Sequence, residues 1–287
     1  MITKMTKEKM ENTRKKMNVY ENKENPMLRN LLEDEKIPFA VLYRVLAGQV
    51  KKVVTDHKRI IIAHTASVFP TWIWAPDDVT EAELNTIYTT IRTEFTPIND
   101  YKFNTKYEIA EYLIRRLKEE GINYSIKVNI ASYECPNPVP PKKKVQGHRD
   151  LLQENEVELA ARLIREASFA IGDVVLNEEE SISAAKEQLH RQVLNVWREE
   201  SGRAVSFCDK RPESDEYTAV SQCYTPEADR GKAYAGQLIY EVCKEIIAEG
   251  KTPILYADAD YAPSNKCYQN IGFKLKKKIA MIGPDGE

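Results

Sequence analysis

The sequence predicts an α/β protein with a mixed sheet, divided into two domains, and three observations support this prediction. Its 287 residues are about twice the length of a typical domain of roughly 150 residues. Runs of branched apolar residues alternate with amphipathic helical patterns along the chain. Four prolines within residues 136–141 interrupt this alternation, because proline continues neither a helix nor a central strand. We therefore expect a charged lead-in at 1–20, an N-terminal mixed α/β domain at 21–135, a stiff linker at 136–144 and a second domain at 145–287.

The composition excludes several classes of protein. The chain is 42% hydrophobic and 30% charged, which is sufficient for a sizeable core and excludes wholesale disorder. The formal net charge is −2, so no global basic field exists and we expect no nucleic acid partner. Five cysteines, an odd number without any Cys-x-x-Cys pair, predict no metal site and indicate free thiols in a reducing cytoplasm. The longest apolar run, at 60–75, is interrupted by His64 and Pro70, so we expect no membrane partner.

The N-terminal half predicts helices and strands in alternation. Asn25-Pro26 opens a short helix, and the branched apolar residues of 41–47 and 59–65 predict two strands. A helix follows, capped by Asp78 or Thr80, and a second covers about 105–120 and ends at Gly121. Residues 122–132 alternate as a strand. This half is interpreted as a possible diverged copy of the C-terminal fold.

The C-terminal half predicts a similar mixture. Helical spacing of apolar residues covers 154–169, 178–190 and 230–249, and a shorter helix is expected at 264–270. Strands are expected at 193–198, 203–209, 217–224, 253–257 and 272–282, with 199–202 as the turn of a hairpin.

The segment from 220 to 235 carries the first chemical signal. A strand, 220–224, leads through the turn 225–229 into the beginning of a long helix. The first turn of a helix exposes unpaired N–H groups and the positive end of the helix dipole. Small residues at 231, 233 and 235 leave that backbone accessible, and Arg230 and Lys232 add positive charge. This arrangement favours a pyrophosphate site, although the spacing is neither that of a P-loop nor that of a dinucleotide fold.

Three separated segments resemble one family in order and spacing. They are Cys223-Tyr224-Thr225-Pro226-Glu227-x-x-Arg230-Gly231-Lys232-Ala233-Tyr234-Ala235, Leu255-Tyr256-Ala257-Asp258, and Pro263-Ser264-Asn265-Lys266-x-Tyr268-Gln269-x-Ile271-Gly272-Phe273. Residues 145–287 thereby resemble the GNAT superfamily of acyl-CoA-dependent N-acetyltransferases. The family's acyl-CoA loop has the pattern Gln/Arg-x-x-Gly-x-Gly/Ala, and this chain departs from it by Ala233 in place of the central glycine. One methyl group at that position is expected to crowd the pyrophosphate.

The resemblance implies roles for individual residues. The strand ending in Gln222, Cys223 and Tyr224, with Thr225, would offer backbone groups to the pantetheine arm of acetyl-CoA, the implied cosubstrate. Asn265 matches the position whose side chain contacts the pantetheine region, and Tyr268 matches the general acid that protonates the CoA thiolate. The pyrophosphate would be held by the loop amides of Arg230, Gly231, Lys232, Ala233, Tyr234 and Ala235.

Further expectations concern the reaction and its alternatives. The implied reaction is direct attack of a primary amine, on a small molecule or peptide, on the acetyl thioester. The sequence leaves the general base open among Asp258, Asp260 and Glu216. A homodimer is a family-level expectation. The alternatives are a non-catalytic acyl-CoA-binding sensor or interaction module, and a nucleotide-phosphate site.

Overall fold

A computed structural model describes residues 17–48, 50–170 and 176–286. The chain divides into two compact units: unit 1 is Met1–Ala131 with Lys277–Glu287, and unit 2 is Ser132–Lys276. This division differs from the predicted one, because the last strand is shared and the predicted linker lies inside unit 2. Among the described residues, no helix combines the length and apolar character needed to cross a bilayer.

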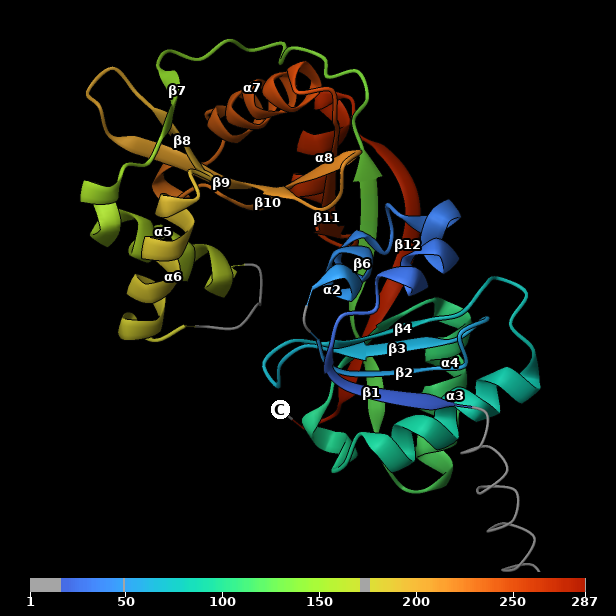
Figure 1. The fold of residues 1–287 in the computed structure, drawn as a ribbon. Helices are drawn as coiled ribbons and strands as arrows, with labels where there is room; N and C mark the ends of the chain where they lie inside the picture. Colours follow the sequence, from blue (N-terminus) through green and yellow to red (C-terminus); the bar gives the residue numbers. More distant parts are fainter. Residues whose placement is uncertain (1–16, 49, 171–175, 287) are drawn as a thin grey trace, which may run out of the picture. The chain divides into compact units, whose positions relative to one another are not determined.

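Unit 1 is a sheet covered on both faces by helices (Figure 1). Helices α3 and α4 contribute to the core on one face, and η1 and α2 contribute to the core on the other. Its strands follow the order β1-β2-β3-β4-β5, and β5 pairs in turn with β12 through Phe103 and Ile282. The elements are β1 (Asn18–Lys23), η1 (Pro26–Glu35), α2 (Ala40–Ala47), β2 (Val50–Thr55), β3 (Ile61–His64), β4 (Thr71–Trp74), α3 (Glu81–Glu94), η2 (Ile98–Asp100), β5 (Phe103–Thr105), α4 (Tyr107–Glu119) and β6 (Tyr124–Glu134).

In unit 2 the strands follow the order β11-β10-β9-β8-β7. Helices α5 and α6 pack on one face of these strands, in a core with Val196 and Phe207. Helix α7 contacts the sheet through β8, β9, β10 and β11. The elements are β7 (His148–Leu151), η3 (Glu154–Glu156), α5 (Val157–Ala170), α6 (Glu178–His190), β8 (Leu194–Arg198), β9 (Ala204–Pro212), β10 (Tyr217–Tyr224), η4 (Glu227–Asp229), α7 (Tyr234–Ala248), β11 (Thr252–Asp258) and α8 (Ala262–Ile271). The last strand, β12 (Lys274–Pro284), begins in unit 2 and continues in unit 1.

The two halves of the chain repeat one order of elements. Each begins with a strand that is followed by helical segments, two in the first half and three in the second, and continues with three strands. Apart from the short helices η2 and η4, each then ends in a helix, a strand, a helix and a strand. The fourth and fifth strands are parallel in both halves, β4 with β5 and β10 with β11. The connection between these strands, a loop and a helix, therefore occupies the same place in both units.

Several predicted elements need correction. Residues 41–47, predicted as a strand, form α2, because Leu42 and Leu46 lie one helical turn apart and are both fully buried. The predicted lead-in contains β1 from Asn18 onward, and residues 1–16 lie outside the described part of the chain. The short strands β2, β4, β5 and β7 were not predicted.

The proline-rich segment packs on unit 2. The Val139 amide donates to the Ile271 carbonyl at 2.7 Å, and the Cys135 amide donates to Pro253 at 2.8 Å. A Cβ atom on Gly272 would lie 2.9 Å from the Asn137 carbonyl oxygen, so this segment lies directly against the end of α8.

Candidate functional site

A bulge marks the end of β10, where the pantetheine contact was predicted. The register between β10 and β9 shifts between Ser221 and Tyr224, and Gln222 has a φ of 50°. The parallel pairing of β10 with β11 covers Tyr217 to Ala219 against Thr252 to Ile254, whereas β10 itself continues to Tyr224. The last residues of β10 therefore extend past the segment that pairs with β11, as a strand that receives an extended ligand on that edge requires.

The loop between β10 and α7 leaves the beginning of the helix without a side-chain cap. Helix α7 begins at Tyr234, four residues later than predicted, because Gly231 and Ala233 adopt φ values of 75° and 70°. Ala233 is the N-cap residue; it makes no side-chain cap hydrogen bond, and the first turn carries no acidic residue. The first amides of α7 thus present unneutralised positive potential, which suits an anionic ligand.

A buried carboxylate holds this loop in place. Asp229 accepts hydrogen bonds from Arg203 at 2.6 and 3.0 Å and from Lys232 Nζ at 2.9 Å. The Arg203 guanidinium, followed by Lys232, lowers the pKa of Asp229 to about 2. Arg230 Nε donates to the Thr225 carbonyl at 3.0 Å. The basic residues that were predicted to bind phosphate therefore also fix the conformation of the loop.

Tyr268 lies on α8, close to the end of β10. Its side chain is buried and packs edge-on against Phe273, with ring centroids 6.0 Å apart. Burial, reinforced by neighbouring Cys223, raises the pKa of Tyr268 well above its ordinary value. The phenol consequently keeps its proton at neutral pH, as a proton donor must.

The cysteines beside Tyr268 are poor nucleophiles. Burial raises the pKa of Cys223 to about 12, and burial also raises the pKa of Cys267. Because the thiolate is the reactive form, both side chains act as packing groups.

Asn265 is already occupied within the protein. Its Nδ2 donates to the carbonyls of Asp258 at 2.7 Å and Tyr261 at 2.9 Å, and its Oδ1 accepts from the Tyr133 hydroxyl at 2.8 Å. These bonds hold the connection between β11 and α8, so Asn265 positions the helix that carries Tyr268. The predicted contact of its side chain with pantetheine stays a prediction.

The three carboxylates considered for the general base are exposed. Asp258 uses Oδ1 to accept the Asp260 amide at 2.9 Å, which closes a turn. Sequence inspection overlooked Asp209, which is fully buried on β9 and bonded to Ser221. Residues 205–209 of that strand are all buried, so no alternating pattern singles out Asp209, and nothing in the sequence shows what it bonds to.

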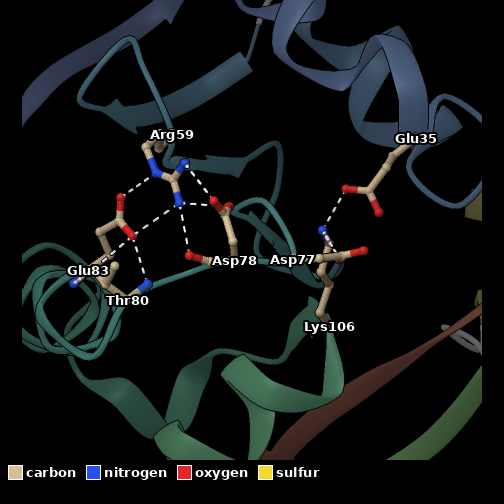
Figure 2. A network of polar contacts seen from close by, with 7 residues as sticks. All are labelled: Glu35, Arg59, Asp77, Asp78, Thr80, Glu83 and Lys106. Atoms are coloured by element: carbon tan, nitrogen blue, oxygen red, sulfur yellow. Dashed lines mark hydrogen bonds and ion pairs between the residues drawn. The ribbon is translucent and has the colours of Figure 1, made fainter.

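The corresponding loop of unit 1 is organised differently (Figure 2). Thr80 caps α3 and forms a capping box with Glu83. Arg59 bridges Glu83 at 2.6 Å and Asp78 at 2.8 Å, and Lys106 bonds Asp77 at 2.7 Å. The beginning of α3 is thus satisfied internally and surrounded by carboxylates. Among the described residues, no group of three His, Cys, Asp or Glu side chains that could hold a metal ion is present.

Comparison with known proteins agrees with the sequence resemblance. Residues 196–281 match the family model described as FR47-like protein. No curated protein matches the chain.

Solved structures match over almost the whole chain. A protein from Drosophila melanogaster has a TM-score of 0.68 at 9% identity, covering 94% of this chain and 98% of that one. The GCN5-related N-acetyltransferase from Sphaerobacter thermophilus has a TM-score of 0.62 at 14% identity, with coverage of 93% and 95%. The corresponding protein from Kribbella flavida has a TM-score of 0.61 at 15% identity, with coverage of 88% and 95%. The chain thus has the fold of the GCN5-related N-acetyltransferases, and its residues 196–281 are similar to the FR47-like family.

Proposed function

We propose that this protein is an acyltransferase that moves an acetyl group from acetyl-CoA to a primary amine. The observation that carries the proposal is the uncapped beginning of α7, which follows a bulged strand end and lies in the same unit as a buried, protonated tyrosine. Each feature suits one part of the cosubstrate: the diphosphate, the pantetheine arm and the sulfur atom.

The binding step uses backbone groups. The amides from Arg230 to Ala235 would hold the pyrophosphate, because they combine unpaired donors with the helix dipole. The exposed backbone of Gln222 to Tyr224 would pair with the pantetheine arm in the manner of an added strand. Holding the thioester in this way would orient its carbonyl for attack.

The chemical step needs a proton at the leaving group. As the amine attacks the thioester carbonyl, the C–S bond breaks and the sulfur gains an electron pair. The Tyr268 hydroxyl would give its proton to this thiolate, and burial of Tyr268 favours that protonated form beforehand.

A thiol-release assay with acetyl-CoA and a panel of amines tests the function. We expect amine-dependent release of CoA by the wild-type protein. Tyr268→Phe should lower kcat by about 100-fold while the Kd for acetyl-CoA changes little. Tyr261→Phe, at a half-exposed tyrosine, serves as the control and should behave as wild type. Loss of acetyl-CoA binding in Tyr268→Phe would contradict the acid role.

A second candidate is a non-catalytic acyl-CoA sensor. Ala233 favours it, because a methyl group stands at a left-handed position where the family uses glycine. Binding of acetyl-CoA without CoA release, for every amine tested, would identify this function.

A further inference from the structure

A buried carboxylate, Asp209, lies beside the bulge of β10 in unit 2. Asp209 on β9 is 0% exposed, and the Ser221 hydroxyl on β10 donates to its Oδ1. Arg211 Nη2 donates to Asp209 Oδ2 at 2.5 Å. A buried carboxylate is costly unless its oxygen atoms have hydrogen-bond partners, and these two contacts provide them.

The hydrogen-bonded pair of Ser221 and Asp209 lies at the same end of β10 as the proposed site. Ser221 directly precedes Gln222, the bulged residue with positive φ. The charge of Asp209 contributes, after burial and neighbouring side chains, to the raised pKa of Cys223, and Cys223 in turn contributes to the raised pKa of Tyr268. Asp209 therefore lies within electrostatic reach of the residues that face the thioester sulfur.

Gln222 adds an unsatisfied acceptor at the bulge. Its Oε1 is buried and has no hydrogen-bond partner among the described residues. A buried acceptor without a donor costs about 1–3 kcal/mol, so a ligand N–H group at this point would gain that energy back. The bulge thus combines two groups. One is the Ser221 hydroxyl, which is hydrogen-bonded to the Asp209 carboxylate, and the other is the unpaired amide oxygen of Gln222.

Resting on the function proposed above, we propose that Ser221 and Asp209 form the proton-accepting pair for the acceptor amine. As the nitrogen attacks the acetyl carbonyl, its acidity rises and it releases one proton to Ser221 Oγ. Ser221 passes its own hydroxyl proton to Asp209 Oδ1, which becomes neutral. The electron pair of the breaking C–S bond remains on sulfur, and Tyr268 gives its own proton to that sulfur.

Burial explains why the transfer needs two residues. Ser221 is partly exposed and contacts the substrate, whereas Asp209 is enclosed and acts through Ser221. Asp209 interacts, by hydrogen bonds or by its charge, with Arg211 on its own strand, with the adjacent Cys208, and with Ser221 and Cys223 on β10. Its register partner on the neighbouring strand β8 is the apolar Leu194. Arg211 donates to the second carboxylate oxygen of Asp209, which leaves Oδ1 for Ser221.

The test measures kcat and the Kd for acetyl-CoA from pH 6 to pH 9.5. Asp209→Asn should lower kcat at pH 7 by about 100-fold with an unchanged Kd. The defect should shrink as the pH rises, because hydroxide takes over the removal of the proton. Asp215→Asn, at an exposed carboxylate of the loop before β10, should match wild type.

A second pair of variants covers the case in which Asp209→Asn fails to fold. Ser221→Ala should reproduce the pH-dependent defect, and Ser221→Thr, which keeps a hydroxyl, should restore most of the activity. The proposal is overturned if Asp209→Asn retains more than half of the turnover, if the defect is equal at every pH, or if Ser221→Thr is as impaired as Ser221→Ala. Failure of the wild-type protein to release CoA would instead overturn the proposed function itself.

Discussion

The junctions between the fourth strand and the following helix differ sharply between the two units. In unit 1, α3 begins with Thr80 and Glu83 in a capping box, and carboxylates at 77, 78, 81 and 83 surround it. In unit 2, α7 begins at Ala233 without a side-chain cap, beside Arg230 and Lys232. The same order of elements therefore has side chains of opposite charge around the beginning of this helix in the two units.

This difference shows how a helix N-terminus is kept for stability or left for binding. The amides at the beginning of α3 are partly satisfied by side chains of the same unit, and the acidic groups there would repel a phosphate. The amides of α7 lack such partners and keep their capacity for an anion. We infer that only the junction of unit 2 binds acyl-CoA, and the following variants test this contrast.

The largest expected effect is on cofactor binding by Gly231→Glu. Gly231 has a φ of 75° and an open space around its Cβ position, so the new side chain strains the backbone and brings a carboxylate to the phosphate site. We expect the Kd for acetyl-CoA, measured by calorimetry, to rise by about 100-fold or more, as expected when charge-assisted contacts of about 3 kcal/mol are lost.

Gly250→Glu provides the matched control for that experiment. Gly250 has nearly the same φ, 77°, and equal open space, but it follows the other end of α7. It should lose similar stability and keep the affinity of wild type. Equal affinity losses in both variants would show that strain alone is responsible and would contradict the placement of the site.

The fold was largely predictable where long periodic segments determine it. The helix at 178–190 was predicted with its observed bounds, and the strand at 217–224 likewise. The beginning of the helix is clear, since Asn177 caps it through its side chain. The hairpin at 199–202 was also confirmed, with Gly202 donating to the Glu199 carbonyl at 2.8 Å.

The elements and side-chain bonds that were not predicted depend on tertiary contacts, which a sequence pattern does not show. The strands β4 and β5 have four and three residues, too few to show a period. Residues 41–47 have the composition of a strand, yet tertiary packing of one helical face decides their structure. At the candidate site, residue types were predicted, whereas the internal bonds of Asn265 and the Asp209–Ser221 pair emerge only from the folded sheet.

The next largest effect is on the stability that the two junctions contribute at acid pH. Both Asp229 and Asp77 have a pKa of about 2 in the folded protein, lowered by Arg203 in one case and Lys106 in the other. A lowered pKa contributes stability above the unfolded value, near 3.8, and loses it as the pH falls towards 2. The Asp229 side chain is 2% exposed and that of Asp77 is 73% exposed, so solvent screens Asp77 far more.

We therefore expect Asp229→Asn to cost about 1–2 kcal/mol of unfolding free energy at pH 7, and Asp77→Asn clearly less. The difference between Asp229→Asn and wild type should disappear between pH 4 and pH 2. Urea unfolding at a series of pH values measures both. A larger loss for Asp77→Asn would contradict the ranking by exposure.

A smaller effect separates stability from binding in unit 1. Thr80→Ala removes the side chain that caps α3, and we expect a loss of about 1 kcal/mol in unfolding free energy. Acetyl-CoA binding should stay unchanged, since this junction is not used for the ligand. Thr80→Ser, which keeps a hydroxyl, should recover most of the loss; a weakened Kd in Thr80→Ala would indicate that unit 1 takes part in binding.

The smallest effect is expected at Ala233, the N-cap of α7. Its φ of 70° lies in the left-handed region, where steric strain destabilises alanine by roughly 1 kcal/mol relative to glycine. Ala233→Gly should therefore stabilise the protein by about 0.5 kcal/mol, because glycine also loses more entropy on folding. Removal of the methyl group should in addition tighten acetyl-CoA binding slightly, while Ala235→Gly, inside the helix, should destabilise by up to about 1 kcal/mol. If Ala233→Gly instead lowered both stability and affinity, the methyl group would be a packing element of the loop, and the crowding expected from the departure at this position would be wrong.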